Sequence, residues 1–373
     1  MTTFIRRFET SGTGIRLAVK DLIDMEGVPT TAGCRALAER AQPAERDAAC
    51  LAGARAAGVR IVGRTNLHEL ALGVSGVNPW YGTPINPLDP SLVPGGSSSG
   101  SAVAVTSGEA EVAFGTDSGG SVRIPAACCG VVGLKTTFGR IPLDGVRPLA
   151  PSLDTVGPMA QDVSGLFVGM ELLEPGFRMN EKFAGRVGRL RVECDPLIDA
   201  AIDRALAATG WEIVDIFVPE WDEAGAACGL IIVAEAWQSN RPLAEGAPEL
   251  IGEDVLERLR VGRDADASAL AVARGIADVW RARLSALFEE IDLLATPTIT
   301  IFPPPIDRAG ELLAARSRCT LQANLSGVPA LALPVPTEGS IPASLQLMAP
   351  WGGEESVLAA GLAIENACAT ILG

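Results

Sequence analysis

The chain reads Ala110-Glu-Val-Ala-Phe-Gly-Thr-Asp-Ser-Gly-Gly-Ser121 at its most informative point. The first half, residues 110–115, is mostly apolar and predicts a short buried strand. The second half, residues 116–121, carries two consecutive glycines and predicts a tight turn directly after that strand. Ser121 therefore closes a glycine-rich turn at the end of a buried strand.

A second glycine- and serine-rich loop precedes this strand. Residues 73–100 are rich in Gly, Asn, Pro and Ser, and they end in Pro94-Gly-Gly-Ser-Ser-Ser-Gly100. Such a composition predicts a loop with strong demands on its backbone. Residues 101–107 then predict a helix, so that two Gly/Ser loops flank one helix and one strand.

The segments closer to the N-terminus alternate between helix and strand. Residues 15–24 read Ile15-Arg-Leu-Ala-Val-Lys-Asp-Leu-Ile-Asp24, an apolar run that predicts a strand with Lys20 at its end. Residues 47–58 predict a helix and residues 59–63 a strand. This alternation is typical of α/β folds, and we expect parallel pairing to dominate the sheet.

The C-terminal half continues the same alternation without a recognisable domain boundary or repeat. We expect strands at residues 211–218, 291–298, 330–335 and 344–348, and helices at residues 224–235, 267–290 and the C-terminus.

The charge balance excludes several classes of partner. The net charge of −15 would repel nucleic acid and anionic membranes, and no Lys/Arg-rich stripe offsets it. The sequence contains no run of about 18 apolar residues and no secretory leader pattern at Met1–Ser11. We therefore expect a cytoplasmic protein without nucleic-acid or membrane partners.

The cysteines and the histidine argue against a metal or redox centre. Eight cysteines occur without CxxC or Cys/His ligand spacing, and Cys128 directly precedes Cys129. We interpret the cysteines as reduced core residues. His68 is the single histidine of the chain, which excludes a multi-histidine metal site. We expect neither a metal nor a cofactor.

Serine is the best candidate nucleophile, because Ser97 and Ser121 lie where glycines allow a backbone to approach a ligand closely. A flexible linker or a phosphate-binding turn is the structural alternative. A serine nucleophile needs a base, and a Ser-His-Asp arrangement would require His68. A lysine serves only if burial lowers its pKa. Lys20 is slightly preferred to its competitor Lys135.

These segments together resemble the amidase signature family, whose members share a Ser–cisSer–Lys triad. The resemblance covers about residues 12 to 373, except residues 175 to 280. In outline the chain is most similar to compact members of the family, such as indoleacetamide hydrolases and malonamidases. It rests on motifs that occur in order: Val19–Asp24, Gly82–Pro87, Gly95–Ala102, Gly115–Ala126, Gly130–Lys135, Ser152–Pro158, Asn324–Pro329 and Leu345–Met348.

The resemblance implies a role for each matching residue. Lys20 corresponds to the base, Ser97 to the bridging serine in a cis peptide, and Ser121 to the nucleophile. The implied oxyanion-hole amides include those of Ser118, Gly119 and Gly120. Support of the site is implied for three further residues, namely Thr116, Asp117 and Ser98.

The implied fold is one large α/β domain, residues 1–373, whose central mixed, mostly parallel twisted sheet has helices on both faces. Within it we expect a signature core at about residues 12–165, a variable middle at about 175–280 and a C-terminal part of the sheet at about 290–373.

The implied activity is hydrolysis of a small carboxamide, with an aryl or aliphatic acyl group, through an acyl-enzyme. The alternatives are an A-type amidotransferase subunit with partner subunits and a catalytically silent scaffold of the same fold. The expected partner is a small-molecule amide, and a homodimer is one expectation because relatives often form one.

Overall fold

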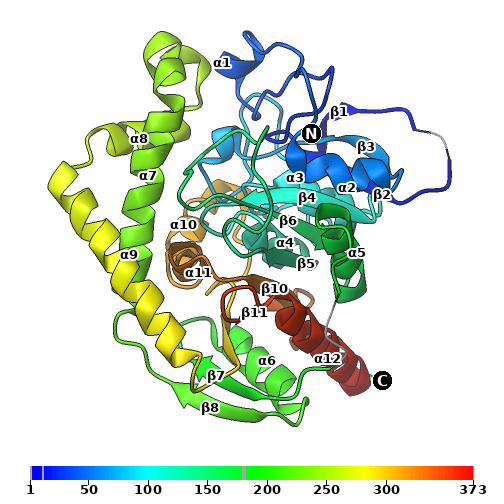
Figure 1. Cartoon of the computed structure of the whole chain (residues 1–373), viewed down its shortest axis with the longest axis vertical. Coiled ribbons are helices and arrows are strands. Elements are labelled where there is room, and N and C mark those ends of the chain that lie inside the picture. Colours follow the sequence, from blue (N-terminus) through cyan, green and yellow to red (C-terminus); the bar gives the residue numbers. More distant parts are fainter. Residues whose placement is uncertain (1, 11, 179–181, 373) are drawn as a thin grey trace.

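The computed structural model describes residues 2–10, 12–178 and 182–372. In this part of the chain, eleven strands form one sheet (Figure 1). The strands follow one another across the sheet in the order β1 (Phe4–Arg7), β3 (Arg60–Thr65), β2 (Arg16–Lys20), β4 (Val112–Asp117), β6 (Thr155–Ala160), β5 (Val132–Lys135), β10 (Ala330–Val335), β11 (Ala343–Met348), β9 (Leu293–Pro297), β7 (Arg186–Leu190) and β8 (Glu212–Ile216).

The α/β class and the mixed sheet are confirmed, but the expected majority of parallel pairs is not. Among the described strands, four neighbouring pairs are parallel. Six are antiparallel. The physical reason is that β10 and β11 form a hairpin, and that β5 and β6 are joined by a loop rather than by a crossover helix.

Helices cover both faces of the sheet. The described α-helices are α1 (Arg35–Ala38), α2 (Ala52–Ala56), α3 (Ser99–Thr106), α4 (Arg123–Cys129), α5 (Val163–Leu173), α6 (Pro196–Ala207), α7 (Trp221–Gly246), α8 (Glu253–Arg263), α9 (Ala267–Leu287), α10 (Glu311–Ser317), α11 (Leu321–Ser326) and α12 (Glu354–Leu372). Short 3-10 helices add η1 (Ala49–Leu51), η2 (Glu69–Ala71), η3 (Pro248–Leu250) and η4 (Ile306–Arg308).

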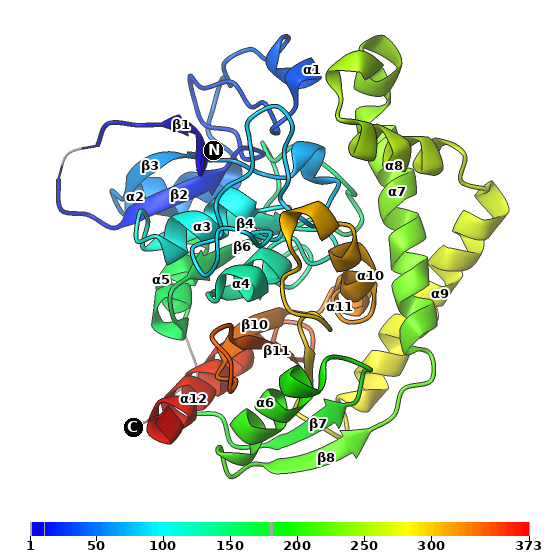
Figure 2. The same cartoon turned by 180° about the vertical axis from the view of Figure 1, so that it is seen from behind.

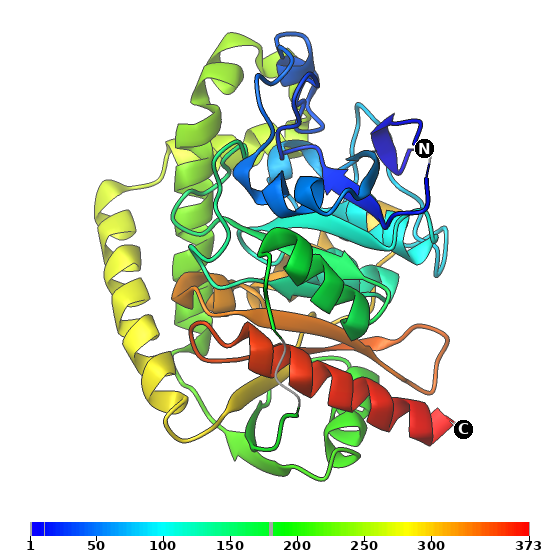
Figure 3. The same ribbon diagram turned by 45° about the vertical axis from the view of Figure 1, so that its right-hand side comes forward.

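The two faces carry different helices. On one face α5 and α12 pack against each other and against the sheet, with α2 and α6 beside them; α12 is the red helix of Figure 3. On the other face α3 packs on β4 and β2, and α4 packs on β5 and β10 (Figure 2). The sheet is thus buried on both sides, which explains why β4, β6 and β9 are buried along their whole length.

A helical layer formed by α7, α8 and α9 stands beside the sheet (Figure 1). Its apolar residues belong to the same core cluster as α11, and Trp221 packs edge-on against Trp280 within it. Residues 221–287 form this layer, and the preceding segment supplies β7 and β8. No described helix is both long and apolar enough to cross a membrane.

All eight cysteines are free, and seven of them are buried. The thiols of Cys128 and Cys129 have raised pKa values, because burial disfavours the thiolate. The expected core position is therefore confirmed for seven cysteines, whereas Cys194 is half-buried.

Candidate active site

Lys20 ends β2 and lies beside the end of β4, because the two strands are parallel neighbours. Its amine donates hydrogen bonds to Ser97 Oγ and to Thr116 Oγ1, each at 2.8 Å. The whole side chain is buried. Lys20 thus lies at the end of its strand, as the sequence predicted, and its amine contacts two hydroxyl groups.

Burial lowers the pKa of Lys20 from 10.5 to about 7, although Asp117 and Asp154 act in the opposite direction. An ammonium without water around it is poorly stabilised, and the nearby carboxylates recover only part of the loss. Near neutral pH the amine is consequently a mixture of charged and neutral forms, and the neutral form has a lone pair that can accept a proton.

Lys135 is the natural comparison, because burial also lowers its pKa to about 7. Its amine donates to the backbone carbonyls of Thr136 and Val328, both at 2.9 Å. These acceptors carry no proton that a base could remove. The pKa values therefore do not separate the two lysines, whereas their hydrogen-bond partners do.

Ser97 lies in the first Gly/Ser loop, and the Gly96–Ser97 peptide bond is cis. The next residue joins this loop to the second one, because the Ser98 amide donates to the Ser121 carbonyl at 3.1 Å. Ser98 Oγ also donates to the Thr116 carbonyl at 3.3 Å. The two loops that the sequence singled out are thus joined by hydrogen bonds around Lys20.

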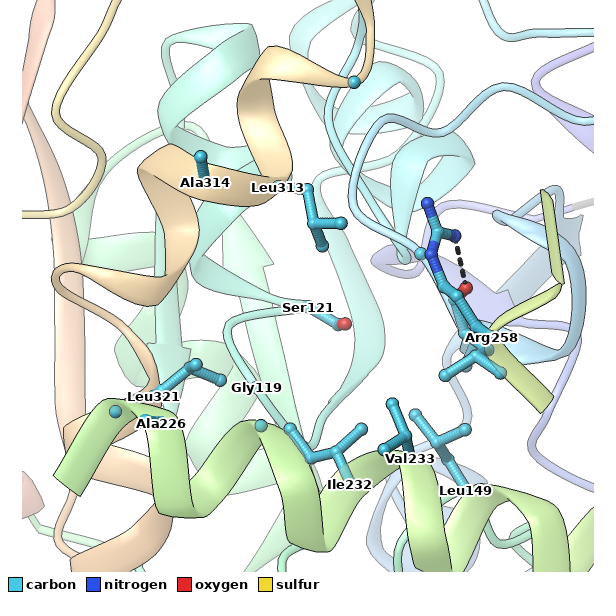
Figure 4. Close-up of a pocket in the computed structure, with 16 residues that line it drawn as sticks. Gly119, Ser121, Leu149, Ala226, Ile232, Val233, Arg258, Leu313, Ala314 and Leu321 are labelled. Atoms are coloured by element: carbon cyan, nitrogen blue, oxygen red, sulfur yellow. Dashed lines mark hydrogen bonds between the residues drawn. The ribbon is translucent and has the colours of Figure 1, made fainter. Parts of the chain in front are cut away.

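Ser121 is 6% exposed, and its hydroxyl points into a pocket (Figure 4). Among the described hydrogen bonds, none uses Ser121 Oγ. The contact between Ser97 Oγ and Ser121 Oγ that the resemblance implies is therefore not a hydrogen bond in this structure. Ser121 is linked to the Ser97 loop through its backbone carbonyl, which accepts the hydrogen bond from the Ser98 amide.

Asp117 holds the turn that carries Ser121. Its carboxylate accepts hydrogen bonds from the amides of Gly120 at 2.7 Å and Val122 at 3.1 Å. Gly120 has φ +115°, and a Cβ there would lie 2.6 Å from Thr320 Oγ1, so only glycine fits. The Gly120 amide, expected at the oxyanion hole, is thus directed at Asp117 in this structure.

Arg123 balances the charge of Asp117 in the interior. The two side chains form a buried ion pair at 2.9 Å. Burial alone would raise the pKa of the Asp117 carboxyl, but the guanidinium outweighs it and keeps the pKa well below its usual range. Asn324 and Gln346 complete the cluster, because both accept hydrogen bonds from Arg123.

Arg123, Asn324 and Gln346 were not predicted from the sequence as site residues. A signal was present, because all three lie in motifs that carry the resemblance. Polar residues inside otherwise apolar segments predict buried hydrogen bonding, but they do not indicate the partner.

Asp154 is the second carboxylate, after Asp117, that accepts a hydrogen bond from the turn that carries Ser121. Ser118 Oγ donates to the Asp154 carboxylate, which also accepts from the amides of Leu149 and Ala150. Burial raises the pKa of Asp154, and these donors oppose the rise. Ser118 is therefore tied to the loop that follows β5.

His68 has a carboxylate partner that its sequence neighbours did not reveal. The ring is buried, with Nε2 3.0 Å from Asp254 Oδ2 and Nδ1 3.4 Å from Ser75 Oγ. Burial lowers the pKa of His68, although Asp254 opposes the shift. No described hydrogen bond joins His68 to Ser97 or Ser121 through its ring, so the ring buttresses α8 rather than the two serines.

The pocket in front of Ser121 has a volume of about 460 Å³, within the range of small-molecule sites. Figure 4 shows α7 along one side and Leu313 and Ala314 of α10 on the other. The walls are predominantly apolar, and within the described part of the chain three Asp, Glu, His or Cys side chains nowhere gather as a metal site. The lining residues are Ala71, Leu72, Gly73, Gly119, Ser121, Leu149, Gly225, Ala226, Gly229, Ile232, Val233, Arg258, Gly310, Leu313, Ala314 and Leu321.

Comparison with known proteins assigns the chain to a family. The family model described as Amidase matches residues 12–175 and 187–358. The chain belongs to the amidase family. The amidase signature recognised in the sequence is therefore confirmed, and the chain is a C–N hydrolase that acts on amide bonds.

The relatives of this amidase are diverse. The A-type subunit of glutamyl-tRNA(Gln) amidotransferase from Thermus thermophilus is 36% identical, over 95% of this chain and 85% of its own length. Fatty acid amide hydrolase of Arabidopsis thaliana is 33% identical, over 97% of this chain and 67% of its own length. A crystal structure of an amidase matches with a TM-score of 0.87 at 31% identity, covering 94% of this chain and 84% of that one.

Proposed function

We propose that the chain hydrolyses a small carboxamide through an acyl-enzyme on Ser121, with Ser97 as the proton relay and neutral Lys20 as the base. The observation that carries this proposal is the 2.8 Å contact between Lys20 Nζ and Ser97 Oγ, in a buried site where the pKa of the amine falls to about 7. An amine with that pKa is well matched to general-base catalysis near neutral pH.

The reaction proceeds in two halves. Lys20 takes the Ser97 proton, Ser97 takes the Ser121 proton, and Ser121 Oγ adds to the amide carbon. The C–N bond then breaks, and Lys20 returns its proton through Ser97 to the leaving ammonia or amine. Water, activated by the same relay, cleaves the ester to a carboxylate and restores Ser121. The relay requires the Ser121 hydroxyl to donate to Ser97 Oγ at the moment of attack.

The negative charge that forms on the carbonyl oxygen requires hydrogen-bond donors. We assign this task to the amides of Ser118, Gly119 and Ser121, which no described hydrogen bond uses. The Gly120 amide instead fixes the turn by donating to Asp117. The Asp117–Arg123 pair and Thr116 support the turn and the base from behind.

Labelling of Ser121 tests the proposal. The purified chain is incubated with ethyl fluorophosphonate and analysed by peptide mass spectrometry, and ammonia release is followed over a panel of simple amides. We expect added mass on Ser121 and ammonia release, with both lost in Ser121→Ala. The control Ser91→Ala, which changes an exposed serine, keeps both. An unlabelled wild-type Ser121 overturns the proposal and favours the silent scaffold.

A second candidate is an A-type amidotransferase subunit that passes ammonia to a partner. It is supported by relatives of that name, which are 31–36% identical to this chain. Ammonia release by the isolated chain favours the plain amidase. Labelling of Ser121 without ammonia release from any amide, together with co-purification of partner subunits, favours the amidotransferase.

A further inference from the structure

Two observations on the Ser121 pocket go beyond the amidase chemistry. The first is that Ser121, a residue only 6% exposed, points its hydroxyl into the cavity, and no described hydrogen bond uses that hydroxyl (Figure 4). The second is that one stretch of the facing helix α7 carries no bulky side chain, although Ile232 and Val233 further along it also line the pocket. Three of its residues on the wall are Gly225, Ala226 and Gly229.

Gly229 lies in the interior of α7 without a packing reason. A Cβ at this position would meet one atom within 4 Å, Leu321 Cδ1 at an ordinary contact distance of 3.9 Å. Gly262 on α8 is different, because a Cβ there would lie 1.9 Å from the Val233 carbonyl oxygen. Glycine disfavours a helix relative to alanine. What Gly229 provides is therefore open space in the pocket.

Among the described lining residues Arg258 is the one cation, and its charge is already balanced by Asp254. Its Nη1 donates to the Leu72 carbonyl at 2.8 Å and lies 3.3 Å from Asp254 Oδ2. The described lining residues next to Gly229 are apolar, namely Leu321, whose Cδ1 would lie 3.9 Å from a Cβ at position 229, and Ile232 on the same helix. An uncharged apolar group thus matches this end of the cavity better than a carboxylate does.

We propose that Gly229 sets the depth of an acyl subsite that takes amides of apolar acids, with an aryl or medium-length alkyl group lying against α7. The inference rests on the proposed function, because the acyl group is placed by a carbonyl carbon next to Ser121. The cavity of about 460 Å³ has room for such a group. A larger side chain at position 229 would occupy that room.

The test compares acetamide with phenylacetamide as substrates of wild type, Gly229→Ala and Gly229→Leu. We expect Gly229→Leu to lower kcat/KM for phenylacetamide by about 100-fold while acetamide stays within about threefold, since one or more methylenes in an apolar pocket discriminate by about 10- to 200-fold. Gly229→Ala improves helix propensity and gives a smaller change in the same direction, so misfolding does not explain the result.

Gly275→Leu is the matched control, because Gly275 lies in the interior of α9, is exposed and would place a Cβ in open space. It leaves the ratio of the two kcat/KM values unchanged. A third substrate, glutaric acid monoamide, tests whether Arg258 recognises a carboxylate. Faster hydrolysis of this monoamide than of phenylacetamide by wild type overturns the apolar subsite.

Labelling of Ser121 separates the failure of this inference from failure of the proposed function. Ethyl and phenylbutyl fluorophosphonates are compared in the same variants, which requires no turnover. Selective loss of phenylbutyl labelling in Gly229→Leu supports the subsite. Equal labelling and equal substrate ratios in all variants overturn the subsite alone, whereas an unlabelled wild-type Ser121 removes the proposed function and the subsite with it.

Discussion

Lys20 Nζ lies 2.8 Å from Ser97 Oγ, although the two residues are 77 positions apart in the chain. The same amine donates to Thr116 Oγ1, so that two hydroxyls share one buried nitrogen. A neutral amine has two N–H groups and one lone pair, so it can donate to one hydroxyl and accept from the other. In its neutral form Lys20 can therefore accept the Ser97 proton while it still donates to Thr116.

The first prediction concerns pH. Because Lys20 acts only when neutral and its pKa falls to about 7, we expect kcat/KM to rise with pH and level off above about 8. Lys20→Ala lowers kcat by about 10³-fold or more, and Lys20→Arg does not restore activity because a guanidinium stays charged. Initial rates between pH 5.5 and 9.5 measure the profile. A profile that is flat between about pH 6 and 9 contradicts a lysine base.

The second prediction separates the two buried lysines. Lys135→Met leaves the midpoint of the rate profile near pH 7, because both described hydrogen bonds of the Lys135 amine go to backbone carbonyls. Stability responds instead. Lys135 in the unfolded chain stays protonated up to about pH 10.5, whereas in the folded protein it loses its proton at about pH 7. Between these two pH values the unfolded state binds more protons, so the free energy of unfolding of the wild type increases with pH.

Urea unfolding at pH 7.5 and 9 measures this gain. Lys135→Met reduces it by about 1 kcal/mol per pH unit, the contribution of one proton. If the midpoint near pH 7 disappears from the rate profile of Lys135→Met but remains in that of Lys20→Ala, then Lys135 and not Lys20 is the base.

The third prediction concerns the ion pair behind the Ser121 turn. Arg123→Met leaves Asp117 charged and unpaired in the interior, so we expect the free energy of unfolding to fall by about 3–5 kcal/mol. The exposed pair of Arg281 and Asp278 is the control, and Arg281→Ala costs less than about 1 kcal/mol. Urea titration compares the two variants, and equal losses would show that the buried cluster does not stabilise the fold.

The fourth prediction concerns His68. Its contacts with Asp254 and Ser75 tie η2 to α8, so His68→Ala lowers the free energy of unfolding by about 1–3 kcal/mol through unpaired buried groups. Because the ring makes no described hydrogen bond with Lys20, Ser97 or Ser121, kcat remains within a few-fold of wild type. Amide hydrolysis and thermal unfolding are measured on the same preparation. A large loss of kcat at unchanged stability would give the histidine a role in the reaction.

Much of the candidate site is predictable from local pattern. The apolar run before Lys20 and the glycines before Ser121 identify strand ends and tight turns, because periodicity and backbone freedom are properties of a few neighbouring residues. The same reasoning predicted the ends of β2 and β4 within two residues. It left the choice between Lys20 and Lys135 almost open, since each ends a strand and each is buried.

Three other features lay beyond local pattern. The direction of β5 and β6 depends on how the chain returns to the sheet, which loop composition does not reveal. The carboxylate partner of His68 is 186 positions away, and the side chains around Arg123 come from segments about 200 positions apart. The α7 wall of the pocket comes from the part of the sequence that carries no motif.

Residue type and spacing therefore established the family, the strand ends and a short set of nucleophiles and bases. The tertiary structure alone distinguishes Lys20 from Lys135, because it places hydroxyl groups against the Lys20 nitrogen and backbone carbonyls against that of Lys135. Both arrangements depend on contacts between distant segments. The depth of the pocket has the same origin, since Gly229 leaves space only because α7 packs across the cavity from Ser121.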